Sequence, residues 1–231
     1  MSAVGIEGNE PPSRAQDAVR ILLIISAAAE SLREPPLHDP ALADAVAVVQ
    51  SQVRLQKLDF WVRNPDYLAD ELLTEYEHGA GDYRLRQAEA ILASDEPQVR
   101  RYPMIRYLFG AYEPLDDAVA VLRSAGLVIR RKRGSAGRVR QHDYYLTRAG
   151  RDTADRITTD FPVFRYFVER TRLAAGLAEG RPGTHLKDRQ YRQEEYRDTR
   201  IGKEIRSIAP RVRDRLQRHL SGPSSQEVPA K

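Results

Sequence analysis

The chain has 231 residues, 41% of them hydrophobic, and can bury the core of one large domain or of two small ones. It has no cysteine, which excludes disulfides, thiolate nucleophiles and cysteine-ligated zinc and fits a reducing compartment. The net charge of +4 hides an uneven distribution, with −8 in residues 1–100, +6 in residues 101–150 and +6 in residues 151–231. This swing predicts separate surfaces for basic and for acidic partners, although solvated charge without a partner explains it as well.

No segment predicts secretion or a membrane span. The longest apolar run, residues 21–29, is interrupted by Ser26 and is far shorter than the roughly 20 residues that cross a bilayer. Glu7 and Glu10 precede this run and no basic segment does, which does not fit a signal peptide. We therefore expect a cytoplasmic protein with no membrane contact, whose ends, residues 1–13 and 221–231, are disordered.

Apolar periodicity predicts four successive helices, over residues 14–33, 41–63, 66–78 and 82–93. Ser13 can cap the first helix, and a proline-rich stretch separates it from the second. Pro65 stops the second helix because proline disfavours the helical conformation in the residue before it, and Gly79 ends the third. Residues 104–109 fit a short strand.

The next segment predicts a winged helix. A short helix over residues 115–125 ends at Gly126, a β-hairpin with strands near 127–133 and 138–146 follows, and Thr147 caps a helix over residues 148–159. An aromatic-bearing helix over residues 161–179 comes next. The expected fold is mainly α with a small β-hairpin: a winged helix-turn-helix core with additional N- and C-terminal helices. One domain would span residues 14–183, followed by a tail of two loosely docked helices over residues 184–220.

The sequence shows no phosphate-binding loop and none of the familiar hydrolase or metalloprotease motifs. The five histidines are scattered without the pairing of metal ligands. Carboxylates cluster at Asp66, Asp70 and Glu71 and at Asp116 and Asp117, but both clusters follow a proline where a helix begins, and acidic side chains are favoured there. We expect no enzyme activity, no cofactor and no metal.

The most specific charged feature is the hairpin, which we call the basic wing. Six cations converge on it and are candidates for nucleic-acid or phosphate contact: Arg130, Arg131, Lys132, Arg133, Arg138 and Arg140. The helix before the wing begins with two aspartates and offers only Arg123 as a base reader, which disfavours sequence-specific DNA binding. A solvated hairpin that keeps a sheet edge soluble is the alternative.

Two further segments predict packing or partner contacts. Leu55, Phe60 and Trp61 leave apolar surface on more than one helix face, so this helix is expected to be mostly buried, with Lys57, Asp59 and Arg63 in polar pairs around it. In the tail, sparse apolar residues among many charges form a possible partner interface that orders on binding: Tyr191, Tyr196, Ile201 and Ile205.

Particular motifs resemble a known family. RLQKLDFWVRNPDYL (residues 54–68) and PMIRYLFGAY (residues 103–112), followed by AGLV (residues 125–128), are similar to the middle component of bacterial ABC-three-component systems, the small subunit also found in Lamassu-type anti-phage defence. Leu186-Lys187 and IGKEI (residues 201–205) resemble the tail of that family.

The resemblance implies a non-catalytic adaptor that bridges an SMC-like or Rad50-like ABC ATPase and a separate effector subunit, possibly a nuclease. The cations of the basic wing predict, independently of the resemblance, that any DNA contact is weak and non-specific. A winged-helix transcriptional regulator is the alternative function. The effector's identity, the trigger and the stoichiometry do not follow from the sequence.

Overall fold

The structure is a computed structural model that describes residues 13–36, 39–94, 104, 106–107, 110–111, 115–135, 138–179 and 193–221. The chain divides into two compact units, each made of two separate stretches. Unit 1 comprises Met1–Leu55 and Glu113–Val168, and unit 2 comprises Gln56–Tyr112 and Glu169–Lys231. The expected disordered ends lie outside the described residues, apart from Ser13 and Ser221.

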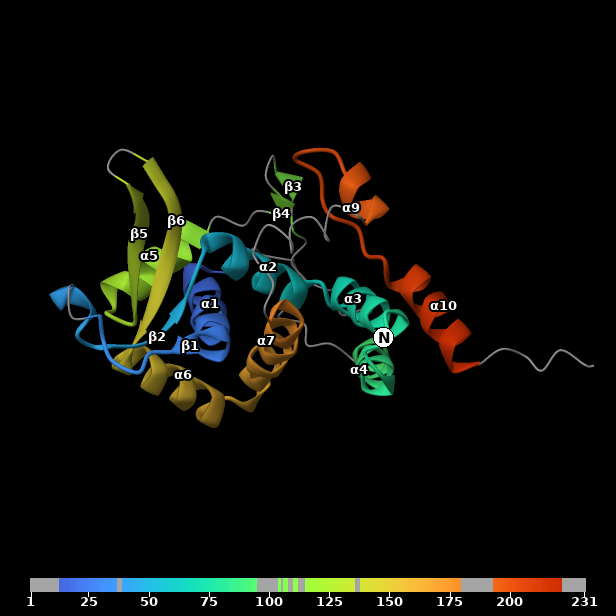
Figure 1. The fold of residues 1–231 in the computed structure, drawn as a ribbon, viewed down its shortest axis with the longest axis horizontal. Helices are drawn as coiled ribbons and strands as arrows, with labels where there is room; N and C mark the ends of the chain where they lie inside the picture. The colour runs from blue at the N-terminus through green and yellow to red at the C-terminus, as the bar shows by residue number, and fades with distance from the viewer. Residues whose placement is uncertain are drawn as a thin grey trace, which may run out of the picture. The chain divides into compact units, whose positions relative to one another are not determined.

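Unit 1 is a helix-covered antiparallel sheet (Figure 1). In chain order it contains α1 (Arg14–Ala28), β1 (Glu30–Ser31), the 3-10 helix η1 (Pro40–Leu42), β2 (Ala45–Val49), α5 (Leu115–Ser124), β5 (Val128–Ser135), β6 (Arg138–Thr147), α6 (Arg148–Asp160) and the 3-10 helix η3 (Pro162–Phe164). The strand order is β1-β2-β6-β5. Helix α1 packs against α5 and α6, and all three helices contact the sheet. The prediction of a mainly helical protein is confirmed.

The predicted helix over residues 41–63 is wrong in its first half. Residues 45–49 form β2, which lies inside the sheet and pairs with β6, Val48 opposite Tyr145 and Val49 opposite Tyr144. The run Ala-Val-Ala-Val-Val is rich in β-branched residues, which favour strands, and it is buried over most of its length, so its apolar periodicity does not distinguish helix from strand. Ser51, at a φ of 75°, turns the chain into α2 (Gln52–Arg63).

The first helix matches its prediction at the N-terminus. The Ser13 hydroxyl accepts from the Gln16 amide and the Gln16 side chain accepts from the Ser13 amide, which completes a capping box. Residues 21–25 are all buried, so α1 forms the centre of unit 1. The helix ends at Ala28 rather than residue 33, because Glu30–Ser31 adds β1 to the sheet beside β2.

A single junction joins α5, the hairpin and α6. Gly126, at a φ of 71°, ends α5, and the Thr147 hydroxyl donates to the Gly126 carbonyl at 2.8 Å while it accepts from the Gly150 amide at 3.0 Å. Gly150 leaves no room for a side chain, since a Cβ there would lie 2.1 Å from the Leu127 carbonyl oxygen. Thr147 and Gly150 thus fix the direction in which the chain passes from the hairpin into α6.

Unit 2 combines helices from both halves of the chain. Its elements are α3 (Pro65–Glu77), α4 (Asp82–Ala93), β3 (Arg106–Tyr107), β4 (Gly110–Ala111), α9 (Glu194–Asp198) and α10 (Ala209–Leu220), and most of α2 and of α7 (Arg165–Ala178) belongs to it. The predicted helices over 66–78 and 82–93 are confirmed almost residue for residue. Trp61 is buried, as expected, and Asp59 and Arg63 form a buried pair at 3.9 Å.

This division differs from the predicted domain over residues 14–183 with a separate tail. The described part of the tail, residues 193–221, contributes buried side chains to unit 2, namely Tyr196, Ile205, Ile208, Val212 and Leu216. The charge swing along the sequence also does not become a difference between the units. Unit 1 has 15 basic and 14 acidic residues and unit 2 has 22 and 19, because each unit combines an acidic with a basic stretch.

Gly150→Ala is expected to lower the unfolding free energy by about 2 to 3 kcal/mol, because the new methyl group forces the Leu127 backbone to move. Gly176→Ala is the matched control: nothing lies within 4 Å of a Cβ at this helical position, and alanine there should stabilise by roughly 0.5 to 1 kcal/mol. Urea denaturation of both variants measures this difference. Equal stability of the two variants would contradict the junction described above.

Candidate functional site

The basic wing lies on the two longest strands of unit 1, and its cations divide between two faces. Residues opposite one another in β5 and β6 share a face, so Val128, Arg130 and Lys132 lie with the buried Leu146 and Tyr144 on the helix-covered side. Arg131 and Arg133 lie on the other face with Asp143 and Gln141. The backbones of Arg138 and Arg140 continue β6, and their side chains lie outside the described residues.

Three wing cations are already paired with carboxylates of unit 1. Arg130 contacts Asp116 at 2.5 Å, Arg131 donates to both oxygens of Asp39 at 2.6 and 3.1 Å, and Arg133 contacts Asp143 at 2.9 Å. Lys132 is exposed. Three of the four wing cations whose side chains the structure describes are therefore compensated by carboxylates of the same unit.

Asp143 joins the wing to the start of α2. Its carboxylate is 2% exposed, and besides Arg133 it accepts from the Gln141 side chain at 2.6 Å and from the Ser51 amide at 3.2 Å. These bonds hold the left-handed backbone of Ser51 in place, which explains a strained conformation at a non-glycine residue. Arg133 is therefore part of the support for this turn as well as a candidate contact.

The acidic start of α5 is paired too. Asp116 contacts Arg130 as described, and Asp117 lies 3.4 Å from Arg14 of α1 in an exposed pair. The exposed face of α5 otherwise presents Ala120, Val121 and Ser124, with Arg123 as its one cation. This surface offers few donors to base edges.

In unit 2, carboxylates of α3 hold the C-terminal helix. We call Asp66, Asp70 and Glu77 the α3 acidic row. Asp66 accepts from the Ser207 hydroxyl and from the Ile208 amide, both at 2.7 Å, so it caps the start of α10. The other two carboxylates bind side chains of α10.

Asp70 and Glu77 bind the side chains that line one stripe of α10. Asp70 is bound by Arg211 at 3.2 Å and by Arg215 at 2.7 Å. Glu77 is bound by Arg215 at 2.5 Å and by His219 at 2.7 Å. The acidic cluster at Asp66 and Asp70 thus does more than favour the start of its own helix, because Asp70 binds side chains that lie 141 and 145 residues away in the sequence.

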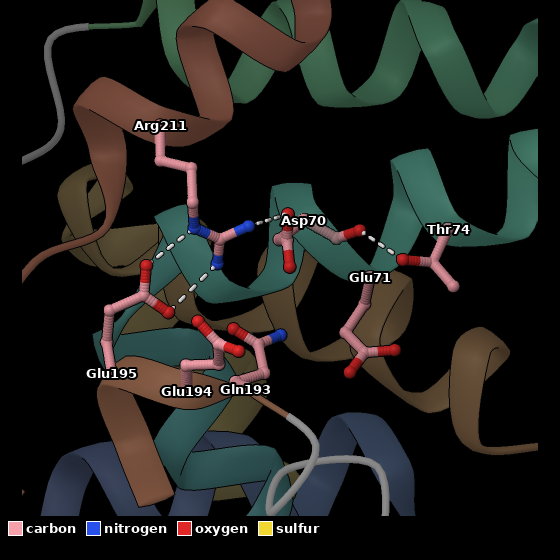
Figure 2. A pocket seen from close by; sticks show the side chains of 7 residues that line it. All are labelled: Asp70, Glu71, Thr74, Gln193, Glu194, Glu195 and Arg211. Carbon is pink, nitrogen blue, oxygen red and sulfur yellow. Dashed lines mark hydrogen bonds and ion pairs between the residues drawn. The ribbon is translucent and has the colours of Figure 1, made fainter. Parts of the chain in front are cut away.

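A cavity of about 280 Å³ lies beside this clamp, between α3, α9 and α10 (Figure 2). Its lining includes Asp70, Glu71, Glu194 and Glu195, and Arg211 is its single cation among the described residues. Figure 2 shows the Arg211 guanidinium between Glu195, which it contacts at 2.6 and 3.2 Å, and Asp70. Two of the four carboxylates are therefore engaged in holding α9 and α10 to α3.

The predicted partner interface in the tail requires a correction. Tyr196 is fully buried: its ring packs edge-on against Phe60, and the Lys57 ammonium and the Arg106 guanidinium lie over it. Ile205 is also buried, so neither side chain is accessible to a partner. Ile201 is 58% exposed and fits the prediction of an accessible residue, and Tyr191 lies outside the described residues. Alternation of apolar and charged residues does not reveal this burial, because the covering helices come from elsewhere in the sequence.

Neither a metal cluster nor a membrane-spanning helix is found in the part of the chain that the structure describes. No three His, Asp or Glu side chains there converge as metal ligands would, and no helix there is long and apolar enough to cross a bilayer.

The His142 imidazole lies in the sheet, where burial together with Arg130 and Lys132 lowers its pKa and favours the neutral form.

The α3 acidic row was not predicted as a unit, although the sequence contains a signal for it. Asp66, Asp70 and Glu77 follow one another at intervals of four and seven residues and so share a helix face, as do Arg211, Arg215 and His219 at intervals of four. An acidic stripe and a basic stripe on two predicted helices indicate that the two helices can pair. No family model, curated protein or solved structure matches this chain, so the description of the site is based on the residues of this chain alone.

The clamp makes stability depend on pH in acid. Hydrogen bonds from the Arg215 guanidinium, opposed in part by burial and assisted by His219, lower the pKa of Glu77 from 4.5 to about 2. A carboxylate with a depressed pKa stabilises the fold above its ordinary pKa, and this contribution is lost as the pH falls from 4.5 towards 2. We expect Glu77→Gln to reduce the loss of unfolding free energy across this window, measured by urea denaturation at a series of pH values. Glu89→Gln, at an exposed position of α4, should leave the loss unchanged, and the same slope in all three proteins would contradict the clamp.

Proposed function

We propose that this protein is a non-catalytic adaptor subunit that bridges an SMC-like or Rad50-like ABC ATPase and an effector, possibly a nuclease, in a cytoplasmic bacterial anti-phage defence complex. Unit 1 would be its winged-helix module. A helix followed by a hairpin, with a third strand paired to the second strand of that hairpin, is the order of a winged helix and supports this assignment.

The observation that carries the proposal is the convergence of the motifs that resemble the family. Backbone hydrogen bonds join the second motif to the tail motif: the Arg106 amide donates to Lys203, the Gly202 amide to Arg106, and the Ile205 amide to Met104. The first motif contacts the second, since the Asn64 side chain donates to the Met104 sulfur. The Tyr67 hydroxyl donates to the carbonyl of Arg206, the residue that follows the tail motif. Segments separated by many residues thus build one core, as expected if the resemblance reflects a shared fold.

The wing geometry favours protein contact over a role as a transcriptional regulator. A regulator needs a helix that reads bases and a wing that is free to contact phosphates. Here α5 offers Arg123 alone as a basic reader, and Arg130, Arg131 and Arg133 are held by carboxylates. DNA contact through the wing would accordingly be weak, independent of sequence and abolished by salt.

Co-expression with a neighbouring ATPase and effector tests the adaptor function. We expect the full chain to co-elute with both proteins in size-exclusion chromatography, and to hydrolyse neither ATP nor DNA when purified alone. The full chain is required because a truncation after residue 183 would remove Tyr196, Val212 and Leu216 from the core of unit 2. A full chain that elutes alone in the presence of both candidates would contradict the proposal. So would a preference for one operator that resists salt, which is the behaviour of a regulator.

A further inference from the structure

Strand β5 forms one edge of the sheet in unit 1, and no described strand pairs with its outer side. In an antiparallel pair, alternate residues direct their N–H and C=O groups away from the partner strand, so β5 presents unpaired backbone donors and acceptors along residues 128–133. An exposed edge of this kind is a template for another strand.

A groove of about 440 Å³ runs beside this edge. Its walls are Ala120, Arg123 and Ser124 of α5, and Val128, Ile129, Arg130 and Arg131 of β5. Ala120 and Ser124 are one helical turn apart and have small side chains, which leaves space for an extended backbone to approach β5. Ile129 is half-buried and offers an apolar contact in the same groove.

The charge of the groove selects an acidic occupant. Arg123 lines the groove and Lys132 lies next to it on β5, and both side chains are exposed. Arg130 and Arg131 also line it but are paired with Asp116 and Asp39, and of these two carboxylates Asp116 is the more exposed. Exposed ion pairs contribute little to stability, so a carboxylate of a partner can replace Asp116 at little cost. Consecutive cations along β5 also disfavour pairing with the same edge of a second copy of this chain.

We propose that the groove between α5 and β5 binds an acidic, extended segment of a partner protein as a fifth strand of the sheet. The proposal deepens the adaptor function and rests on it, since it names the surface and the chemistry by which a partner is engaged. A peptide strand fits better than a nucleic acid because it satisfies the backbone groups of β5, which a phosphate backbone cannot pair in register.

The test uses the full chain and a short fluorescent peptide of alternating Val and Glu, with binding measured by fluorescence anisotropy and by amide hydrogen exchange. We expect binding that protects the amides of residues 128–133. The same peptide N-methylated at alternate residues keeps its charge but cannot pair as a strand, and we expect it not to bind.

Arg123→Glu combined with Lys132→Glu should weaken peptide binding by at least about tenfold, because Arg123 lines the groove and Lys132 is an exposed cation of the same strand edge. Arg148→Glu combined with Arg156→Glu, at exposed positions of α6, changes the net charge equally and should leave binding intact. Thermal unfolding checks that both double variants fold like the parent.

Three results would overturn the strand proposal: no peptide binding, equal binding of the N-methylated peptide, or tighter binding of duplex DNA without protection of residues 128–133. A dimer of the chain that the peptide dissociates would identify a second copy as the occupant and would also overturn it. If the variant with Arg123→Glu and Lys132→Glu still co-purifies with the ATPase and the effector, the adaptor function stands, but the partners do not bind through this groove.

Discussion

The clamp between the α3 acidic row and α10 is the interaction on which unit 2 depends. Asp66 caps the start of α10, and Asp70 and Glu77 bind the stripe formed by Arg211, Arg215 and His219. Asp70 and Arg215 are both largely buried, and removing one partner of a buried ion pair typically costs about 3 to 5 kcal/mol. The clamp thereby holds α10 on α3, a helix from the first third of the chain.

Pairing of acidic with basic side chains also explains why the uneven charge along the sequence does not produce an acidic unit and a basic unit. Acidic and basic residues are segregated along the sequence, and the fold pairs them within each unit: Asp39 with Arg131, Asp116 with Arg130, and α3 with α10. Opposite fields on two bodies therefore do not arise, and the expectation that such fields steer two unlike partners loses its main support. Partner contacts are expected instead at particular exposed groups, such as the backbone edge of β5 with its neighbouring cations, and Ile201.

Local signals in the sequence account for most of the elements. The capping box at Ser13, the stop at Pro65, Gly79 and the Gly126 turn placed helix ends correctly because these residues act through their own backbone or nearest neighbours. Residues 45–49 were misassigned because a strand buried on both faces has no period that separates it from a buried helix. Partners far away in sequence, not local propensity, decide that segment.

The sequence predicted which charged residues form clusters in the candidate sites, but it did not predict the ion-pair partners of those residues. The cations of the wing and the carboxylates of α3 were identified as clusters, yet their roles depend on Asp39 and on α10, which lie far from them in the sequence. Tyr196 and Ile205 were assigned to a partner for the same reason: a sparse apolar pattern does not show that α2 and α3 cover it.

Amide hydrogen exchange of the isolated full chain tests the central claim, that the C-terminal helix is folded into unit 2 without a partner. We predict that the amides of Val212 and Leu216 are protected as strongly as those of Leu72 and Leu73 in α3, and that Asp70→Asn lowers the protection of both helices together. Rapid exchange of Val212 and Leu216 in the unmodified chain, with α3 still protected, would contradict the account.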